Sequence, residues 1–126
     1  MNDNTPSLHE LTQVKQAACF IEQSMEQHHT TKQLAKKFKL SLQSLKLFFK
    51  REYGMGTHAY LKAKRMDKAR EMLLNGDPNK VIIATIGYEN ETTFCRAFKE
   101  LYKETPMNWK VQQATQQKNH SVHRPT

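Results

Sequence analysis

The fold is decided by a stretch in the C-terminal half, IGYENETTFCRAFK, which occupies residues 86–99. Gly87 predicts a tight turn, because glycine tolerates the left-handed backbone conformation that ends a helix. Asn90 is a favourable N-cap residue, so a new helix is expected to begin directly after it. Phe94 and Phe98 are four positions apart, which places both on one buried face of that helix. The stretch therefore predicts a turn followed by a capped, amphipathic helix.

The chain carries an earlier copy of this pattern, displaced by 49 residues. The matched pairs are Ser41 with Asn90, Leu45 with Phe94, Phe49 with Phe98, Lys50 with Lys99, Tyr53 with Tyr102 and Tyr60 with Trp109. Upstream of the turn the displacement is 48 residues, as between Leu34 and Ile82, so one residue is inserted there. Each copy predicts a helix-turn-helix, in which the second helix is the candidate recognition helix.

A long helix is expected between the two copies, from an N-cap at Thr57 to about Leu74, because residues 75–78 (NGDP) break it. At about 1.5 Å per residue it spans roughly 25 Å. It could hold two recognition helices about 34 Å, or one DNA turn, apart, so that both enter successive major grooves. The expected fold is all-α, with two helix-turn-helix subdomains joined by a long linker helix and about seven helices.

The expected organisation begins with a helix that Ser7 and Glu10 cap reciprocally and that runs to about His28 or His29. The last segment lacks apolar periodicity and is rich in Gln, which is typical of disorder. The expected segments are a disordered N-terminus (residues 1–6), the first helix-turn-helix subdomain (7–56), the linker helix (57–75), the second helix-turn-helix subdomain (76–111) and a disordered polar tail (112–126).

The composition is that of a small, basic protein. The 126 residues include 20 Lys and Arg against 12 Asp and Glu, a net charge of +8. Residues 31–75 alone carry a net charge of +9. Such a block indicates a polyanionic partner such as nucleic acid, although a Lys-rich solvated surface would look the same. Two cysteines are too few for a disulfide scaffold and suggest reduced thiols in a cytosol. The longest aliphatic run, residues 81–84, is far too short to span a membrane.

No catalytic constellation is visible, so we expect a protein that is not an enzyme. Ser-His-Asp sets, paired carboxylates and phosphate-binding glycine loops are all missing from the sequence. The pairs His28-His29 and His120-x-x-His123 lack cysteine or carboxylate partners at metal-ligand spacing. We therefore expect neither a metal nor another cofactor.

Six residues on the outward faces of the two recognition helices are candidates for reading base edges. Gln43 can make two hydrogen bonds to adenine, and Arg96 can donate twice to guanine. Leu47 can contact a thymine methyl group. The complete set is Gln43, Lys46, Leu47, Thr92, Cys95 and Arg96. Glu91 could accept a hydrogen bond from a cytosine amine or only cap its helix, and both interpretations stay open.

A second set of residues is expected at the DNA backbone. Lys50 and Lys99 suit phosphate contacts, which supply affinity without sequence information. The amides at Thr31 and near Thr57 lie at expected helix N-termini, where phosphates are favoured. For any single one of these residues, a solvated polar side chain is the alternative interpretation.

The chain resembles the DNA-binding domain of the AraC/XylS family of bacterial transcription regulators. The most specific stretches are residues 86–88 (IGY), 94–99 (FCRAFK) and 105–106 (TP). Single positions match the first half of the family pattern: Leu34-Ala35, Leu40-Ser41, Leu45, Phe49-Lys50, Gly54, Tyr60-Leu61, Arg65, Ala69 and Leu73-Leu74. The chain departs from the family pattern at Leu47 and Lys103, where the family usually has Arg and Gly. It also has Ile83 where the family has a small residue, and Trp109-Lys110 where the family usually has Tyr-Arg or Phe-Arg. At Lys103 a non-glycine left-handed helix cap is therefore expected.

The resemblance implies a sequence-specific regulator that binds double-stranded DNA in the bacterial cytoplasm, at the nucleoid, with RNA polymerase as a further partner. One chain supplies two reading helices, so we expect a monomer on an asymmetric site. Two alternatives stay open, a nonspecific nucleic-acid binder and a helical protein-interaction module, the latter favoured by Leu47, Glu89 and Glu91. The chain has no room for a separate effector domain, so it is either a stand-alone regulator or a piece of a longer protein.

Overall fold

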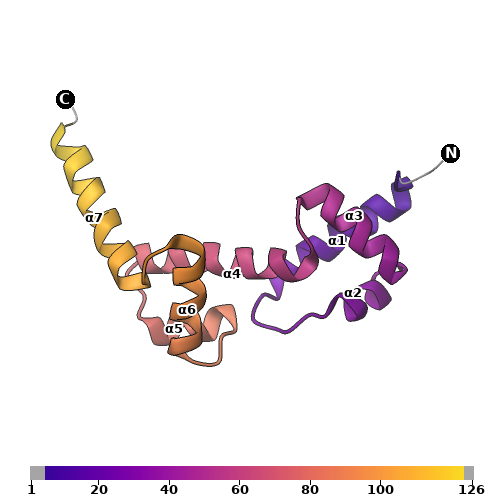
Figure 1. Ribbon diagram of the computed structural model, residues 1–126, viewed down its shortest axis with the longest axis horizontal. Coiled ribbons are helices and arrows are strands. Elements are labelled where there is room, and N and C mark those ends of the chain that lie inside the picture. The colour runs from indigo at the N-terminus through magenta and orange to yellow at the C-terminus, as the bar shows by residue number, and fades with distance from the viewer. Residues whose placement is uncertain (1–4, 124–126) are drawn as a thin grey trace. The chain divides into compact units, whose positions relative to one another are not determined.

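The computed structural model describes the backbone of residues 5–123 and the side chains of residues 5–115. Within that part of the chain it contains seven α-helices and no strand (Figure 1). The helices are α1 (Leu8–Gln23), α2 (Thr31–Lys37), α3 (Leu42–Tyr53), α4 (Thr57–Leu74), α5 (Asn79–Ile86), α6 (Glu91–Tyr102) and α7 (Pro106–His123). The predicted all-α class with about seven helices is confirmed. Both copies of the repeat form a helix-turn-helix, α2 with α3 and α5 with α6.

The chain divides into two compact units, Met1–Arg65 and Met66–Thr126. The boundary falls inside α4, the helix expected to link the two subdomains. The reason is that α4 buries side chains in both units. Tyr60 and Leu61 belong to the core of the first unit, and Met66, Ala69 and Leu73 are buried in the second.

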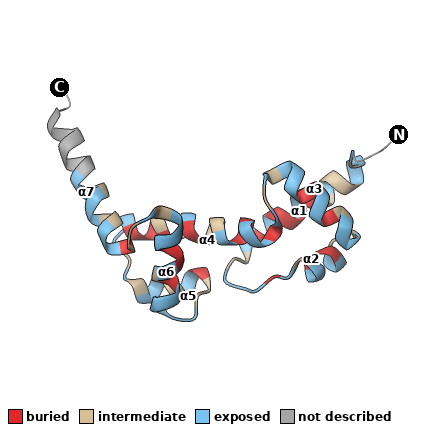
Figure 2. Cartoon of the chain, viewed as in Figure 1, coloured by how far each residue is buried: buried red, intermediate tan, exposed pale blue. Residues whose placement is uncertain are grey.

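The first core lies between α1, α2, α3 and the start of α4, and α3 packs against both α1 and α2 (Figure 2). Its buried members are Val14, Ala17, Ala18, Ile21, Leu34, Ala35, Leu45, Phe48, Phe49, Tyr60 and Leu61. The Tyr60 hydroxyl donates a hydrogen bond to the Glu22 carboxylate. Burial of apolar surface on several helices at once is what stabilises a unit of this size.

The second unit packs α5 and α7 against α6. Ile82, Ile86, Phe94 and Phe98 are fully buried. The ring of Trp109 in α7 lies edge-on to Phe98, with 5.8 Å between the ring centroids. The apolar face of α6 is therefore covered, and its other face is left to solvent.

The caps predicted from local sequence are present. In α1 the Glu10 amide donates to Ser7 Oγ at 3.1 Å, and the Ser7 amide donates to Glu10 Oε1 at 3.0 Å. The N-cap predicted at Asn90 and its repeat partner Ser41 are also present, with side chains that accept from the amides of Thr93 and Ser44. Thr30 caps α2 in the same way, because its side chain accepts from the Gln33 amide.

Left-handed residues close both recognition helices. Gly54 ends α3 with φ of 77°, and Lys103 ends α6 with φ of 67°. A non-glycine residue in this conformation costs on the order of 1 kcal/mol. The left-handed cap predicted at Lys103 is therefore present, with its strain.

Helix α1 ends at Gln23, earlier than the predicted end at His28 or His29. The cause is a contact from far along the chain, because the Arg65 guanidinium donates to the Met25 carbonyl at 2.7 Å and the Gln27 carbonyl at 3.1 Å. Residues 24–26 form turns instead, and the Gln27 amide donates to the Ser24 carbonyl at 3.0 Å. His29 is buried in the same loop, and its Nε2 lies 2.8 Å from the Ser24 carbonyl oxygen.

Thr57 was expected to cap α4, but it is the first residue of the helix, and the Tyr60 amide donates to the Gly56 carbonyl at 3.0 Å. Three leucines near helix ends are exposed: Leu42 at 39%, Leu74 at 50% and Leu101 at 47%. Each lies in the first or last turn of its helix, where the side chain reaches past the core.

Helix α7 continues to His123. The expectation of a disordered tail is therefore wrong for residues 112–123, which are helical. Gln112 Nε2 donates to Glu104 Oε1 at 2.9 Å, which ties the second turn of the helix to the loop before it. The predictions for residues 1–4 and 124–126 lie outside the described residues. No described helix is both long enough and apolar enough to cross a membrane.

Candidate nucleic-acid interface

The outward face of α3 presents the side chains predicted to read bases. Leu45, Phe48 and Phe49 are buried, which fixes the rotation of the helix about its axis. Gln43 and Lys46 are then exposed to solvent, and so are Lys50 and Leu47, the last at 42%. An exposed leucine between two lysines gives this face one apolar contact point.

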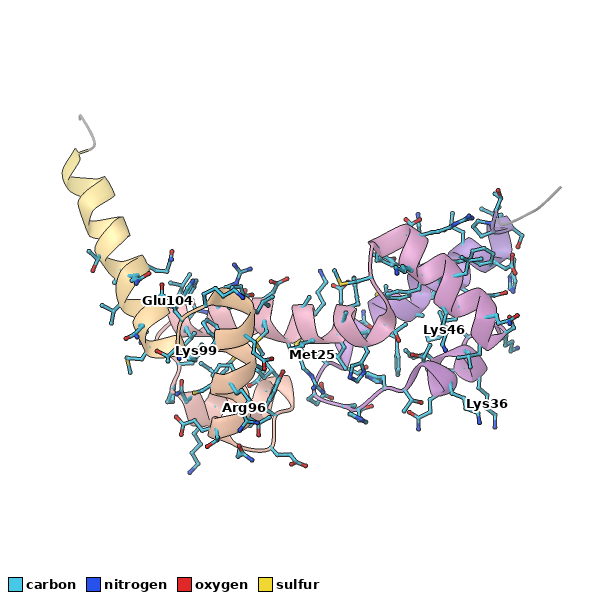
Figure 3. All side chains as sticks on the ribbon, viewed as in Figure 1. Met25, Lys36, Lys46, Arg96, Lys99 and Glu104 are labelled. Atoms are coloured by element: carbon cyan, nitrogen blue, oxygen red, sulfur yellow. The ribbon has the colours of Figure 1, made fainter. Side chains whose placement is uncertain are left out.

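The outward face of α6 is arranged in the same way. Phe94, Ala97 and Phe98 are buried, so Arg96 and Lys99 project into solvent, where Figure 3 labels them. Thr92 is also exposed. The Arg96 fork is therefore available for a bidentate contact with a planar acceptor pair.

Cys95 is half-buried on this helix. Burial raises the pKa of its thiol, and the nearby Glu91 carboxylate raises it further. The group therefore stays a neutral thiol at physiological pH, a weak hydrogen-bond donor and not a reactive thiolate.

A surface hollow in the first unit gathers three of the four residues predicted to bind phosphate, Thr31, Lys50 and Thr57. We call it the first hollow, and it is lined by Thr31, Lys46, Lys50, Gly56, Thr57 and His58, among others. Thr31 Oγ1 and Thr57 Oγ1 lie 2.8 Å apart, which joins the first turn of α2 to the first turn of α4. Since the Thr57 residue is only 4% exposed, what it can offer a phosphate is the backbone amide at the start of α4.

His58 is the residue of the first hollow that the sequence reasoning missed. It is exposed in the first turn of α4, and its ring lies edge-on to that of His28 with 6.5 Å between centroids. Its position directly after a predicted helix start was the available signal, because the first turn of a helix favours anions.

A second hollow lies at the related place of the second unit. It is lined by Gly76, Asp77, Asn79, Glu91, Met107 and Lys110, with Leu73 and Pro78 beside them. Asn79 Nδ2 donates to Glu91 Oε2 at 2.7 Å, which ties the start of α5 to the start of α6. Lys99, predicted to bind phosphate, does not line this hollow.

The histidine pairs considered for metal binding have other neighbours. His29 contacts Ser24, with 3.0 Å from its Nε2 to the serine Oγ, and His28 contacts His58. The side chains of His120 and His123 lie outside the described ones. Among the described residues, no three His, Cys, Asp or Glu side chains are grouped so as to hold a metal ion.

Known proteins share this arrangement. A family model described as a helix-turn-helix domain matches residues 34–112. The regulatory protein PocR of Salmonella typhimurium is 28% identical over 122 residues, which cover 96% of this chain and 38% of that protein. The chain therefore spans well under half the length of this curated relative.

Two solved structures are similar in fold and in sequence. The C-terminal domain of AraT, a response regulator from Geobacillus stearothermophilus, aligns with a TM-score of 0.73 and 27% identity over 79% of this chain and 84% of that one. The C-terminal domain of the response regulator yesN from Fusobacterium nucleatum aligns with a TM-score of 0.68 and 32% identity over 76% and 95%. With the family match over most of its length, the chain belongs to the AraC/XylS family of transcription regulators, of which it carries the tandem helix-turn-helix domain.

Proposed function

We propose that this chain binds double-stranded DNA in a sequence-specific manner, with α3 and α6 reading successive major grooves. The observation that carries the proposal is the pair of N-capped helices whose apolar faces are buried and whose outward faces present Lys46 and Arg96. An α-helix fits the B-DNA major groove, and such side chains match its pattern of donors and acceptors.

Base reading is assigned to the exposed faces. Arg96 donates to guanine O6 and N7, Gln43 pairs with adenine, and Lys46 donates to guanine. Leu47 covers a thymine methyl group. Thr92 and the Cys95 thiol make the remaining polar contacts of α6.

Backbone binding is assigned to Lys50 and Lys99 and to the amides at Thr31 and Thr57. These contacts set the register of the protein on the duplex and make its affinity depend on salt. The first hollow supports the assignment for three of the four residues, because it brings Thr31, Lys50 and Thr57 to one place.

The biological setting is part of the same proposal. We place the chain in the bacterial cytoplasm at the nucleoid, bound to DNA as a monomer because it holds both reading helices itself. RNA polymerase is the proposed protein partner, and no catalytic step is assigned to the chain.

The test is selection of bound duplexes from a random pool, followed by competition against random DNA over a salt series. We expect a motif of two boxes about one helical turn apart, and a preference of at least about 1,000-fold over random DNA. Uniform affinity with a steep salt slope would instead identify a nonspecific binder, and no DNA binding would favour a protein-interaction module.

Arg96→Ala isolates one base contact. It should weaken binding to the selected site by about 1–3 kcal/mol and relax the preference at one position. Lys68→Ala is the matched control, because it removes a positive charge from α4, where Lys68 pairs with Glu71 at 3.0 Å. Equal effects of the two variants would contradict the assignment of Arg96.

A further inference from the structure

The two hollows occupy matching places in the internal repeat. Thr31 and Asn79 are the first residues of α2 and α5, and each lines its hollow. His58 and Met107 are the second residues of α4 and α7, and they line the two hollows in the same way. Each hollow therefore lies where the first helix of a motif meets the helix that follows the recognition helix.

The two hollows differ in the charges of their lining residues. Lys46, Lys50 and His58 line the first hollow, and none of its lining residues is acidic. The second hollow contains two carboxylates, Asp77 and Glu91, against one ammonium group. An anion is therefore attracted by the first hollow and opposed by the second.

The Glu91 carboxylate is held in place. Its Oε2 accepts the hydrogen bond from Asn79 Nδ2 at the start of α5. That is the region of the motif where a helix N-terminus would otherwise favour a phosphate. A fixed negative charge there repels a polyanion more effectively than a mobile one, because its position does not relax away from the approaching phosphate.

The charge of the whole units follows the same trend. The first unit, residues 1–65, contains eleven Lys and Arg against five acids, and the second, residues 66–126, contains nine against seven. The excess of positive charge is thus concentrated in the unit with the cationic hollow.

We propose that Glu91 is a negative determinant of DNA-backbone binding: held by Asn79, its carboxylate keeps a DNA phosphate out of the second hollow while the first hollow accepts one. This inference rests on the proposed function. The first unit then supplies most of the salt-dependent affinity, and the second contributes mainly through base contacts such as that of Arg96.

The test compares Glu91→Gln with Glu100→Gln in the full chain, on the selected duplex and on random duplex, over a salt series. Glu100 is on the same helix, nine residues later and thus on its opposite side, and is exposed. We expect Glu91→Gln to bind both duplexes up to about tenfold more tightly at low salt, with a slope of log K against log salt steeper by about 0.9, as for one more phosphate. Glu100→Gln should leave the slope unchanged.

The reciprocal variant puts a carboxylate into the first hollow. His58→Glu should lower affinity for both duplexes and make the salt slope shallower, whereas His9→Glu, the same substitution at an exposed position of α1, should not. Thermal melting monitored by circular dichroism verifies that each variant is folded at the assay temperature, because Glu91 also lies in the favourable first turn of α6.

Several results would overturn the inference. Weaker binding by Glu91→Gln with a changed preference at one base pair would mean that Glu91 reads a base. Equal effects of Glu91→Gln and Glu100→Gln would contradict the proposal that the Glu91 carboxylate excludes a DNA phosphate. Absence of DNA binding by all of these proteins would contradict it as well. A wild-type protein that does not prefer the selected duplex contradicts the proposed function instead, and the comparison of the two variants on random duplex still decides the role of Glu91.

Discussion

Thr31 and Thr57 join the two helix starts of the first hollow through hydroxyl groups 2.8 Å apart. Because the residue Thr57 is nearly fully buried, its hydroxyl depends on this partner. The bond therefore links the stability of the first unit to the geometry of its proposed phosphate site.

Thr57→Val tests that link. Loss of the hydroxyl leaves Thr31 without its partner and should lower the free energy of unfolding by about 1–2 kcal/mol, measured by urea denaturation. The double variant Thr31→Val/Thr57→Val should be more stable than the sum of the single changes predicts, because no polar group is then left unpaired. Strict additivity would show that the two hydroxyls do not interact.

Tyr60→Phe tests the bond between α4 and α1. The Tyr60 hydroxyl donates to the Glu22 carboxylate, so its removal should cost about 1–2 kcal/mol at pH 7, measured by denaturation. Tyr53→Phe is the matched control, because it removes a hydroxyl from a half-buried ring of the same cluster, 5.0 Å from the Tyr60 ring between centroids. An equal loss in both variants would mean that the bond to Glu22 contributes nothing of its own.

The hydrogen bond between Tyr60 and Glu22 also predicts that the free energy of unfolding depends on pH. Burial raises the pKa of Tyr60 above its ordinary value, and the hydrogen bond to the Glu22 carboxylate raises it further. The unfolded chain therefore releases the Tyr60 proton at a lower pH than the folded chain does. The contribution of this hydrogen bond to the free energy of unfolding is complete below about pH 10, and it is lost as the pH rises through the pKa of Tyr60 in the folded protein. Above about pH 10 the stability of Tyr60→Phe should fall less steeply than that of the wild type, and parallel curves would contradict the assignment.

Lys103→Gly tests the strained helix cap. Lys103 has φ of 67°, where glycine is favoured, so the substitution should raise stability by about 0.5–1 kcal/mol. Lys99→Gly, at a helical position in the last turn of the same helix, should lower stability by about the same amount. Thermal melting measures both, and a destabilised Lys103→Gly would mean that the lysine side chain contributes more than the strain costs.

The parts of the fold that depend on neighbours in sequence could be predicted. Caps at Ser7, Ser41 and Asn90 need only a side chain and an amide three positions away. The end of α1 could not be predicted, because it depends on Arg65, about 40 residues later. The part of α7 after residue 111 was not predicted because that segment has no apolar periodicity, whereas Gln and Ala favour a helix by propensity alone.

In the candidate interface, too, features set by neighbouring residues could be predicted and features set by packing could not. Exposure of Arg96 follows from the spacing of the apolar residues on its helix, so it was predictable. The place of His58 in the first hollow and the Asn79–Glu91 bond require elements to be packed together. Sequence spacing left Glu91 with two open interpretations, and only the packed structure gives it a partner.

Leu47 provides the last prediction, a contact with a thymine methyl group. Its side chain is 42% exposed on α3 between residues assigned to DNA contacts, so a methyl group in the groove would cover it. Replacing thymine by deoxyuridine at each position of the selected site removes one methyl group at a time. One such replacement should weaken wild-type binding by about 1 kcal/mol, as expected for the burial of one such group.

Leu47→Ala should make binding insensitive to that same replacement while it leaves the effects of the others unchanged. Gln43→Ala is the control, because it also shortens a side chain on α3 but should keep the sensitivity to the methyl group. The four combinations of protein and DNA form a double-mutant cycle whose coupling energy measures the contact directly. If that energy is zero at every thymine, Leu47 does not touch a base, and the first recognition helix must read DNA through its polar residues alone.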